Sequence, residues 1–580
     1  MEHRTYNCNG SGQSEKMQRD LSSSPHQEEI LEENGEFPMI RRAISRIPHV
    51  CIVGAGLAGL RCADILLNHG VKVTILEGRN RIGGRVSQSD ALGHSVDLGP
   101  NWIHGTETNP ILDLAKETNT VVMNWDGRQA MFDQTGKDIE EKETAEIIEV
   151  VWSIIEQAMK YSNDHSAEIS AERSLYDFFQ EQVQKAYPSL IENDKEAQSK
   201  RERILQHAEM WGAFVGSPIQ TQSLKFFWME ECIDGENLFV AGTYKKILEK
   251  IARPVLKGAN IIFNTKVVKI TSSNTDEELK LIVSTDTEDK LSFDEVVMTA
   301  PLGWLKKNKQ SFEPALPSRL NQAIDAIGYG HLDKVYIKFP TAFWNESYSN
   351  AIVSNEPQTS HNVVATIAPL NQGSIPPINP NHWPGFTIWS SPRYAPDTNP
   401  SHWNQECINL AALPADTAHP TLLFYTFGPT SLHLASLLSA YSSPDSPPAQ
   451  ELLKEFFHPY FSRLPNYSAS DPSHQPEKLL ATAWANDELA GFGSYANFQT
   501  GLENGDKDVE AMRRGLPERG LWLAGEHTAP FVALGTATGA YWAGEGVAKR
   551  IAKAYGLKGE RGGDGSGDST DKKIEEGHVE

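Results

Sequence analysis

A glycine-rich turn between an apolar run and a helix constrains this chain most strongly. The apolar run His49–Val53 leads into Gly54–Gly59, which reads GAGLAG. A helix is expected from about Leu57 to Asn68, and a second strand from Val71 to Leu76. A buried strand, a tight turn, a helix and a second strand form a βαβ unit, so the sequence predicts a Rossmann-like domain on a parallel sheet.

The spacing of the three glycines has a specific chemical meaning. Gly54 would permit the tight turn, Gly56 would let a pyrophosphate approach the backbone, and Gly59 would let the helix pack on the strand. Phosphate oxygens would then lie at the helix N-terminus, where free N–H groups favour anions. Glu77 follows the second strand, 18 residues after Gly59, where its carboxylate can accept from ribose hydroxyls. The alternative is an ordinary glycine-rich turn, but the full context favours a dinucleotide site.

Composition narrows the class of partner. The 580 residues contain 53 Lys+Arg and 76 Asp+Glu, a formal net charge of −23. The chain has no surplus of basic residues that could replace the counterions of a phosphate backbone, so we expect neither nucleic acid nor an anionic membrane as a partner. The acidity serves solubility, or it steers a cationic small molecule to the protein.

The cysteines and the lengths of the apolar runs indicate the expected cellular compartment of the chain. Five cysteines without a CxxC pair suggest neither a zinc site nor a thioredoxin motif, and they suit a reducing compartment; no metal site is expected. We find no signal-peptide pattern and no apolar run of about 18 residues, so we expect a cytoplasmic chain without a membrane span. Polar residues 1–46 and Gly-rich, charged residues 558–580 are expected to be disordered tails.

Further elements are predicted from periodicity and from turn residues. They are a helix over Glu143–Met159, paired strands over Ile261–Ile270 and Lys280–Ser284, a strand over Leu521–Ala524 and a helix over Ala537–Ala554. The Pro-, Asn- and Ser-rich stretch 345–420 reads as a partly irregular insertion that could gate a site.

The segment after Glu77 distinguishes between dinucleotides. It reads Gly78-Arg79-Asn80-Arg81-Ile82-Gly83-Gly84-Arg85 and resembles the E-x-x-x-R-x-G-G-R pattern of the FAD-binding flavoproteins that include the amine oxidases. Two glycines let the backbone pass close to a cofactor, and the arginines can neutralise its phosphates. The alternative is a surface salt-bridge cluster.

Other segments, in family order, resemble polyamine oxidases over nearly all of the expected ordered chain. They are Asp97–Gly105, Asn264–Val267, His331–Val335, Trp484 with Gly493–Tyr495, Leu523–Thr528 and Gly535–Tyr541. The resemblance implies an α/β fold of two interleaved domains, a Rossmann-like FAD-binding domain and a substrate domain with an antiparallel sheet and helices. The FAD domain would comprise 47–120, 240–305 and 475–557, and the substrate domain 121–239 and 306–474.

The resemblance also implies roles for individual residues in binding FAD. Glu77 would bind the adenosine ribose, Arg79 and Arg85 the phosphates, and Val267 the adenine through its backbone. The isoalloxazine would lie along the segment Gly99, Pro100, Asn101 and Trp102, and Trp484 would line it. Glu526 would hold the ribityl or phosphate region. Thr536 and Ala537 would supply backbone contacts at the ring. No cysteine precedes the final helix at the position that carries the flavin in covalent monoamine oxidases, so FAD is expected to be bound noncovalently.

The same resemblance suggests the catalytic residues. Lys334 would hold a water beside flavin N5, unless it is a strand-end lysine that points to solvent. His104 would bind a substrate amine, unless it is a structural loop residue. Trp484, Tyr495 and Phe531 are candidates to line the substrate pocket, although aromatic residues more often belong to a core.

The implied reaction is oxidation of a C–H bond beside an amine nitrogen, with hydride transfer to flavin N5. Hydrolysis of the imine and reoxidation by O2 to H2O2 would follow. A polyamine is the expected substrate. The sequence leaves open a monoamine or L-amino-acid oxidase, a histone demethylase, and a catalytically silent FAD-binding protein, and it does not indicate an oligomeric state.

Overall fold

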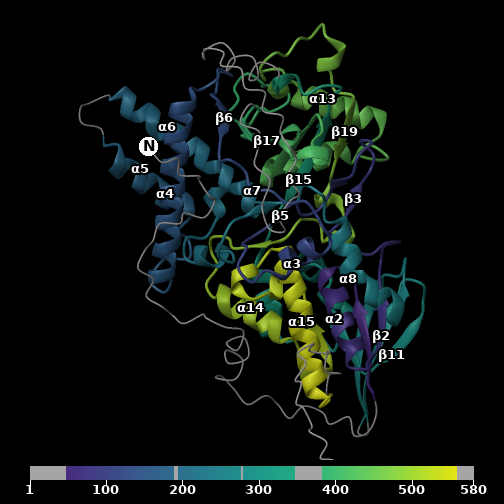
Figure 1. Ribbon diagram of the computed structural model, residues 1–580. Helices are drawn as coiled ribbons and strands as arrows, with labels where there is room; N and C mark the ends of the chain where they lie inside the picture. Colours follow the sequence, from purple (N-terminus) through teal and green to yellow (C-terminus); the bar gives the residue numbers. More distant parts are fainter. Residues whose placement is uncertain (1–46, 189–193, 276–277, 346–381, 558–580) are drawn as a thin grey trace, which may run out of the picture.

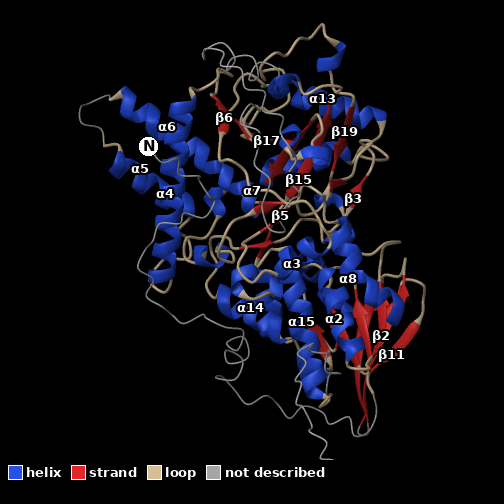
Figure 2. Cartoon of the chain, in the orientation of Figure 1, coloured by secondary structure: helices blue, strands red, loops and turns tan. Residues whose placement is uncertain are grey.

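The computed structural model describes residues 47–188, 194–275, 278–345 and 382–557. The two expected tails and the central part of the 345–420 insertion lie outside the described residues. Figures 1 and 2 show a parallel sheet with its helices in the lower half of the view and a second sheet in the upper half. Within the described residues, no helix is both long and apolar enough to cross a bilayer.

The expected βαβ unit is confirmed and belongs to a five-stranded parallel sheet. Its strands, in spatial order, are β21 (Leu521–Leu523), β12 (Glu295–Met298), β1 (His49–Val53), β2 (Lys72–Leu76) and β8 (Asn260–Ile262). Helix α2 (Leu57–Asn68) packs between α15 (Ala537–Ala554) and α8 (Lys245–Gly258). Their apolar faces and the sheet share one core, which explains why the strands read as continuous apolar runs.

The expected strand over Ile261–Ile270 is two strands in different sheets. Strand β8 ends at Ile262, and Asn264 adopts a left-handed conformation with φ 52°. The backbone N–H groups of Asn264 and Thr265 then donate to the carbonyls of Arg79 and Glu77 instead of extending the strand. Strand β9 (Val267–Thr275) begins afterwards and pairs antiparallel with β10 (Glu278–Thr285), in a four-stranded sheet completed by β11 (Lys290–Phe293) and β13 (Phe312–Glu313).

A six-stranded, mostly antiparallel sheet forms the second half of the molecule. Its spatial order is β19 (Lys478–Ala481), β15 (Leu332–Lys338), β18 (Thr421–Phe427), β17 (Gln405–Asn409), β16 (Phe386–Trp389) and β6 (Gln129–Phe132), with only the last pair parallel. Strand β19 belongs here, although its residues fall in the 475–557 stretch expected for the cofactor domain. An aromatic core lies between one face of this sheet and the helices α12 (Gly428–Leu438) and α13 (Pro447–Phe461).

A helical group lies beside the second sheet, at the upper left of Figure 1. Its members are α4 (Glu141–His165), α5 (Leu175–Ala186) and α6 (Lys195–Ala208), followed by the short α7 (Gly212–Val215). Helix α4 is longer than the expected 143–159, and its apolar stripe packs on the other two helices.

Shorter elements complete the two halves. The remaining helices are α3 (Pro110–Glu117), α9 (Leu302–Lys307), α10 (Ser318–Ala326) and α14 (Gly505–Arg514). Three two-stranded pairs are β3 (Gln88–Ser89) with β4 (Val96–Asp97), β5 (Trp102–Ile103) with β7 (Leu238–Phe239), and β14 (Gly328–Tyr329) with β20 (Ala496–Asn497).

Candidate active site

One large cavity, of about 1960 Å³, joins the two halves of the molecule. It begins at the carboxyl ends of β1 and β2, where doubly wound folds bind their ligands. It then passes the face of the six-stranded sheet and reaches α4. Pockets for one small molecule usually measure about 300–1,000 Å³, so this cavity has room for a dinucleotide and a second ligand.

The glycine-rich turn is built as the spacing predicts. Gly54 has φ +104°, and a Cβ there would lie 2.7 Å from the Thr299 hydroxyl oxygen. A Cβ on Gly59 would lie 2.1 Å from the carbonyl oxygen of Gly54, so helix α2 approaches the turn too closely for any side chain. A Cβ on Gly56 would meet no atom closer than 4.0 Å and would project into the cavity.

Helix α2 therefore presents a free N-terminus to the cavity. Its N-cap is Gly56, no side chain caps it, and its first turn carries no acidic residue. An uncapped helix N-terminus beside a glycine cradle is suited to a phosphate group. These residues fit the pyrophosphate of a dinucleotide.

Glu77 organises the turn around that cradle. Its two carboxylate oxygens accept from the backbone N–H groups of Ala55, at 2.7 Å, and Arg79, at 2.8 Å. Each oxygen retains a lone pair, so the carboxylate can still accept from hydroxyls in the cavity.

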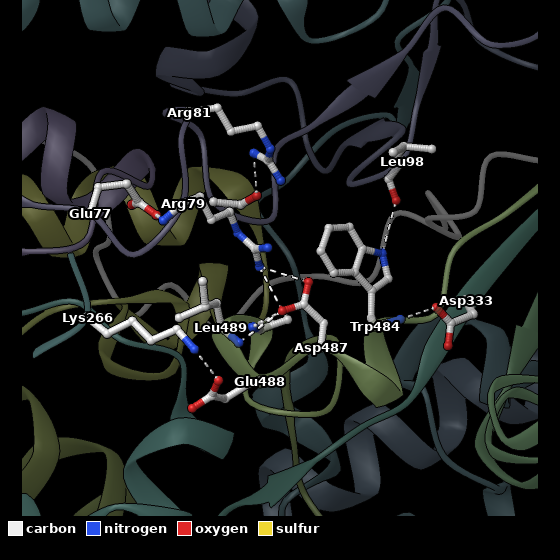
Figure 3. Close-up of polar contacts among 12 residues, drawn as sticks. Glu77, Arg79, Arg81, Leu98, Lys266, Asp333, Trp484, Asp487, Glu488 and Leu489 are labelled. Carbon is white, nitrogen blue, oxygen red and sulfur yellow. Dashed lines mark hydrogen bonds and ion pairs between the residues drawn. The ribbon is translucent and has the colours of Figure 1, made fainter. Parts of the chain in front are cut away.

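The two arginines expected at the phosphates are paired with carboxylates. The Arg79 guanidinium donates to both oxygens of Asp487, at 2.9 and 3.0 Å (Figure 3). Arg85 pairs with the buried Glu526 at 2.9 Å and also donates to the Ser494 carbonyl at 2.6 Å. Both arginines and Glu526 line the cavity, but neither cation is free of a counter-charge.

Lys334 reaches into the cavity wall from β15. Its side chain is only 4% exposed, and its Nζ donates to the carbonyl oxygens of Gly99 and, at 3.2 Å, Asp97. Burial lowers the pKa of the Lys334 amine below its usual range, while the nearby Asp97 carboxyl opposes this shift. Burial raises the pKa of Asp97 in turn. The pair places a proton-exchanging group beside the Gly99–Trp102 segment, as functional sites often require.

The neighbour of Lys334, Asp333, fixes Trp484. The buried Asp333 carboxylate accepts from the Trp484 backbone N–H and from the Thr482 and Ser431 hydroxyls, each at 2.7 Å. The Trp484 indole N–H donates to the Leu98 carbonyl at 3.1 Å (Figure 3). Trp484 and Lys334 thus both donate to carbonyls of the 97–99 backbone.

Tyr425 holds the next part of this segment. Its hydroxyl donates to the Asn101 side-chain oxygen at 2.8 Å and accepts from the Trp102 indole N–H at 3.2 Å. Gly99, Pro100, Asn101 and Trp102 all line the cavity.

The expected substrate residues separate into two groups. His104 and Tyr495 line the cavity: His104 Nδ1 lies 3.3 Å from the Asn237 side-chain oxygen, and the Tyr495 hydroxyl donates to the Phe214 carbonyl at 2.8 Å. Burial lowers the pKa of His104. The lining does not include Phe531, whose ring packs edge-to-face on Trp228 with 5.4 Å between centroids.

The closing segments also converge on the cavity. Val267, Thr536 and Ala537 line it, and the Thr536 hydroxyl caps α15 by accepting from the Gly539 N–H at 2.9 Å. Most of the expected cofactor residues therefore surround one cavity, and Gly59 acts one layer behind it.

Sequence reasoning gave no role to several carboxyls and aromatics that line the cavity or lie behind its wall. Asp97 was visible only as the first residue of a motif, and Asp333 as part of the lysine motif. Tyr425, Glu406 and Glu230 carried no local signal, because each is brought to the cavity by pairing or packing between distant segments.

Comparisons with known proteins agree with this geometry. A family model described as flavin containing amine oxidoreductase matches residues 57–552. Probable polyamine oxidase 4 of Arabidopsis thaliana is 28% identical over 311 residues, 51% of this chain and 59% of that protein. Protein FLOWERING LOCUS D of Arabidopsis thaliana is 25% identical over 493 residues, 83% of this chain and 52% of that protein. The alignments thus span little more than half the length of these curated relatives.

A solved structure shares the fold. A putrescine oxidase bound to putrescine superposes with a TM-score of 0.57 at 15% identity, covering 88% of this chain and 99% of that one. The family model begins at α2, after β1 and most of the glycine turn, and covers the other strands of both sheets, Lys334 and the closing segment. The chain therefore belongs to the flavin-containing amine oxidoreductase family.

Proposed function

We propose that this protein is an FAD-dependent amine oxidase that acts on polyamines and uses O2 as the electron acceptor, with H2O2 as a product. The observation that carries the proposal is the buried Lys334 amine, held at the Gly99 and Asp97 carbonyls in the wall of a cavity that starts at a dinucleotide turn. The polyamine oxidase relatives support the substrate class.

The chain offers a distinct contact for each part of FAD. The α2 N-terminus with Gly56 would bind the pyrophosphate, Glu77 the adenosine ribose and the Val267 backbone the adenine. The segment 99–102 would lie along the ring system, with the backbone at 536–537 at its far end and Glu526 nearer the ribityl chain. Arg85 would act on the phosphates as part of its pair with Glu526.

Bound flavin supplies the two-electron acceptor for a C–H bond beside the amine nitrogen, and the protein supplies orientation and electrostatics. An ammonium has no lone pair to assist the oxidation, so the substrate nitrogen must be neutral when it reacts. The aromatic and apolar wall around Trp484 and Tyr425 disfavours charge by desolvation. Lys334, with its lowered pKa, can hold or accept a proton at Nζ next to that nitrogen.

The alternatives fit the cavity less well. An L-amino-acid oxidase needs a buried arginine for the substrate carboxylate, but the arginines of the described lining are Arg79 and Arg85, both paired at the cofactor end. The thiol in the described lining is Cys232, whose pKa burial raises to about 12, which leaves it unreactive and favours noncovalent FAD.

The test is to reconstitute the protein with FAD and add amines without oxygen. Spermine or spermidine should bleach the visible flavin absorbance, and air should restore it with release of H2O2. Benzylamine, L-amino acids and a methyl-lysine histone peptide serve as competing substrates, and product identification names the bond cleaved. A flavin that binds but is reduced by none of these amines would support a catalytically silent protein and reject the proposal.

A further inference from the structure

A short segment runs along the edge of the cavity from the second sheet to the cofactor half. It comprises residues 484–490, which we call the strap, and it contains the turns η9 (Trp484–Asn486) and η10 (Glu488–Ala490). In Figure 3 the strap lies between Asp333 of the second sheet and the Glu77 side of the cofactor half. Three strap residues line the cavity: Trp484, Glu488 and Leu489.

Hydrogen bonds fix both ends of the strap. At the first end, the Trp484 backbone N–H donates to Asp333, and its indole N–H donates to the Leu98 carbonyl. At the other end, the Ala490 carbonyl accepts from the Tyr329 hydroxyl at 2.6 Å. Ala490 is buried, whereas the other strap residues are partly or fully exposed. The middle of the strap thus has the sparse apolar burial of segments that open locally.

Two ion pairs hold the middle of the strap to the cofactor half. Arg79 donates to both oxygens of Asp487, and Lys266 donates to Glu488 at 2.6 Å (Figure 3). The side chains of the first pair are 18% and 25% exposed, and those of the second pair are 43% and 54% exposed. A bidentate, partly buried arginine pair is stronger than an exposed lysine pair, so the Asp487 pair should contribute more.

These contacts lie at the end of the cavity that is expected to hold the adenosine. Leu489 packs on Gly78, where a Cβ would lie 2.9 Å from the leucine side chain. Gly78 follows Glu77, the expected ribose ligand, and Lys266 precedes Val267, the expected adenine contact. A dinucleotide bound at these residues would therefore lie next to the middle of the strap.

We propose that the middle of the strap, residues 486–489, opens to let FAD enter and leave, and that the ion pairs of Asp487 and Glu488 set the rate of this exchange. The inference rests on the FAD site of the proposed function but not on the oxidation of amines. Both ion pairs join protein to protein, so they oppose opening in the loaded and in the empty protein alike. Weakening them should raise the rate constants for FAD binding and release by the same factor and leave Kd unchanged.

The experiment measures FAD exchange in variants that remove a charge with little change of shape. In Asp487→Asn the amide oxygen can still accept from the backbone N–H groups of Leu489 and Ala490, which Asp487 accepts at 2.9 and 3.1 Å. Stopped-flow flavin fluorescence gives the binding rate with apoprotein, and dilution of the loaded protein gives the release rate. We expect both rate constants to rise about fivefold in Asp487→Asn, about twofold in Glu488→Gln and about tenfold in the double variant.

Glu477→Gln is the matched control. It removes one carboxylate charge just before β19, where Glu477 pairs with Lys338 outside the cavity lining. This variant should change neither rate constant. Sodium chloride should speed FAD exchange in the wild type more than in the double variant, because salt screens partly exposed ion pairs.

The possible outcomes separate the strap from the proposed function. Unchanged rate constants in the double variant, or a change in release alone, would overturn the inference. Slower release would show that Asp487 competes with the FAD phosphates for Arg79, which also overturns it. A protein that exchanges FAD as expected but oxidises no amine would reject the proposed function and leave the strap as inferred. A protein that binds no FAD would reject both.

An exchange of charges guards against a general loss of structure. Lys266→Glu should speed FAD exchange, because it places two carboxylates together. Adding Glu488→Lys should restore slow exchange, because the ion pair is formed again with its charges reversed. If the doubly exchanged variant stays as fast as Lys266→Glu alone, this ion pair does not hold the strap and the inference is rejected.

Discussion

Replacement of Lys334 by methionine tests the centre of the proposed site. Methionine keeps the length and apolar stem of the side chain but removes the amine that donates to the Gly99 and Asp97 carbonyls. The Asp97 carbonyl still accepts from the Tyr336 hydroxyl at 2.6 Å, so only the Gly99 carbonyl loses its side-chain donor. We therefore expect the fold and the FAD content to survive.

The rate effect follows from the lost hydrogen bond. A hydrogen bond that involves a charged group contributes about 1.5–3 kcal/mol. If the Lys334 amine makes such a bond to the reacting molecule only as reaction proceeds, its loss slows the step by about 10- to 150-fold. Because burial lowers the pKa of Lys334, the wild-type pH profile should also contain an ionisation below the usual lysine range that the variant lacks.

Stopped-flow absorbance separates the two half-reactions. Anaerobic mixing with amine measures reduction of the flavin, and mixing of the reduced enzyme with O2 measures its reoxidation. Lys338→Met is the matched control, because Lys338 lies on the same strand but pairs with Glu477 outside the cavity. Unchanged rates in both half-reactions would refute the role of Lys334, and a parallel loss of FAD would reassign it to cofactor binding.

Three further predictions concern the cradle, the substrate and the buried carboxyls. In Gly56→Ala the Tm of the apo-protein should stay unchanged while the Kd for FAD rises at least tenfold, because the new Cβ enters only the cavity. Gly59→Ala should instead lower Tm or prevent folding, because its Cβ would meet the Gly54 carbonyl. Similar losses of Tm in the two variants would contradict this prediction. His104→Ala should raise KM about tenfold for tri- and tetraamines and less for diamines, and an equal loss across the series would argue against substrate contact. Burial raises the pKa of Glu230 from 4.5 to about 8, so the folded form binds the extra proton and the stability contributed by this group falls as pH rises through that window. Thermal melts should therefore show Glu230→Gln gaining Tm over the wild type from about pH 5 to about pH 9, and a constant difference would exclude the effect.

Local signals in the sequence were sufficient where the chemistry is local. The GAGLAG turn, its flanking strands and Glu77 could be predicted because a single βαβ unit contains them all. Lys334 could likewise be predicted from its local motif, and its burial follows from its position on strand β15. The strand break at Asn264 could not be predicted from periodicity, because apolar residues precede it and resume at Val267, and the contacts to 77 and 79 end the strand.

Contacts between distant segments account for the features of the site that the sequence could not predict. Arg79 meets a carboxylate 408 positions away, so its charge balance was invisible in the glycine-arginine segment. Glu406 is brought to the cavity only through the register of three strands that span nearly a hundred positions. The sequence does not show where the ring of an aromatic residue beside a motif points. Phe531 was therefore expected in the cavity, but in the structure its ring packs on Trp228.

The order of strands in the parallel sheet has a consequence for synthesis of the protein. The sheet is started by β1 and β2 and is closed at one edge by β21, which leaves the ribosome roughly 20–90 s after β2 at typical elongation rates. Until then the edge of β12 is uncovered, and an open edge is a template for pairing with other chains. A polypeptide that ends before residue 521 would keep this edge open, because β21 is the strand that covers β12.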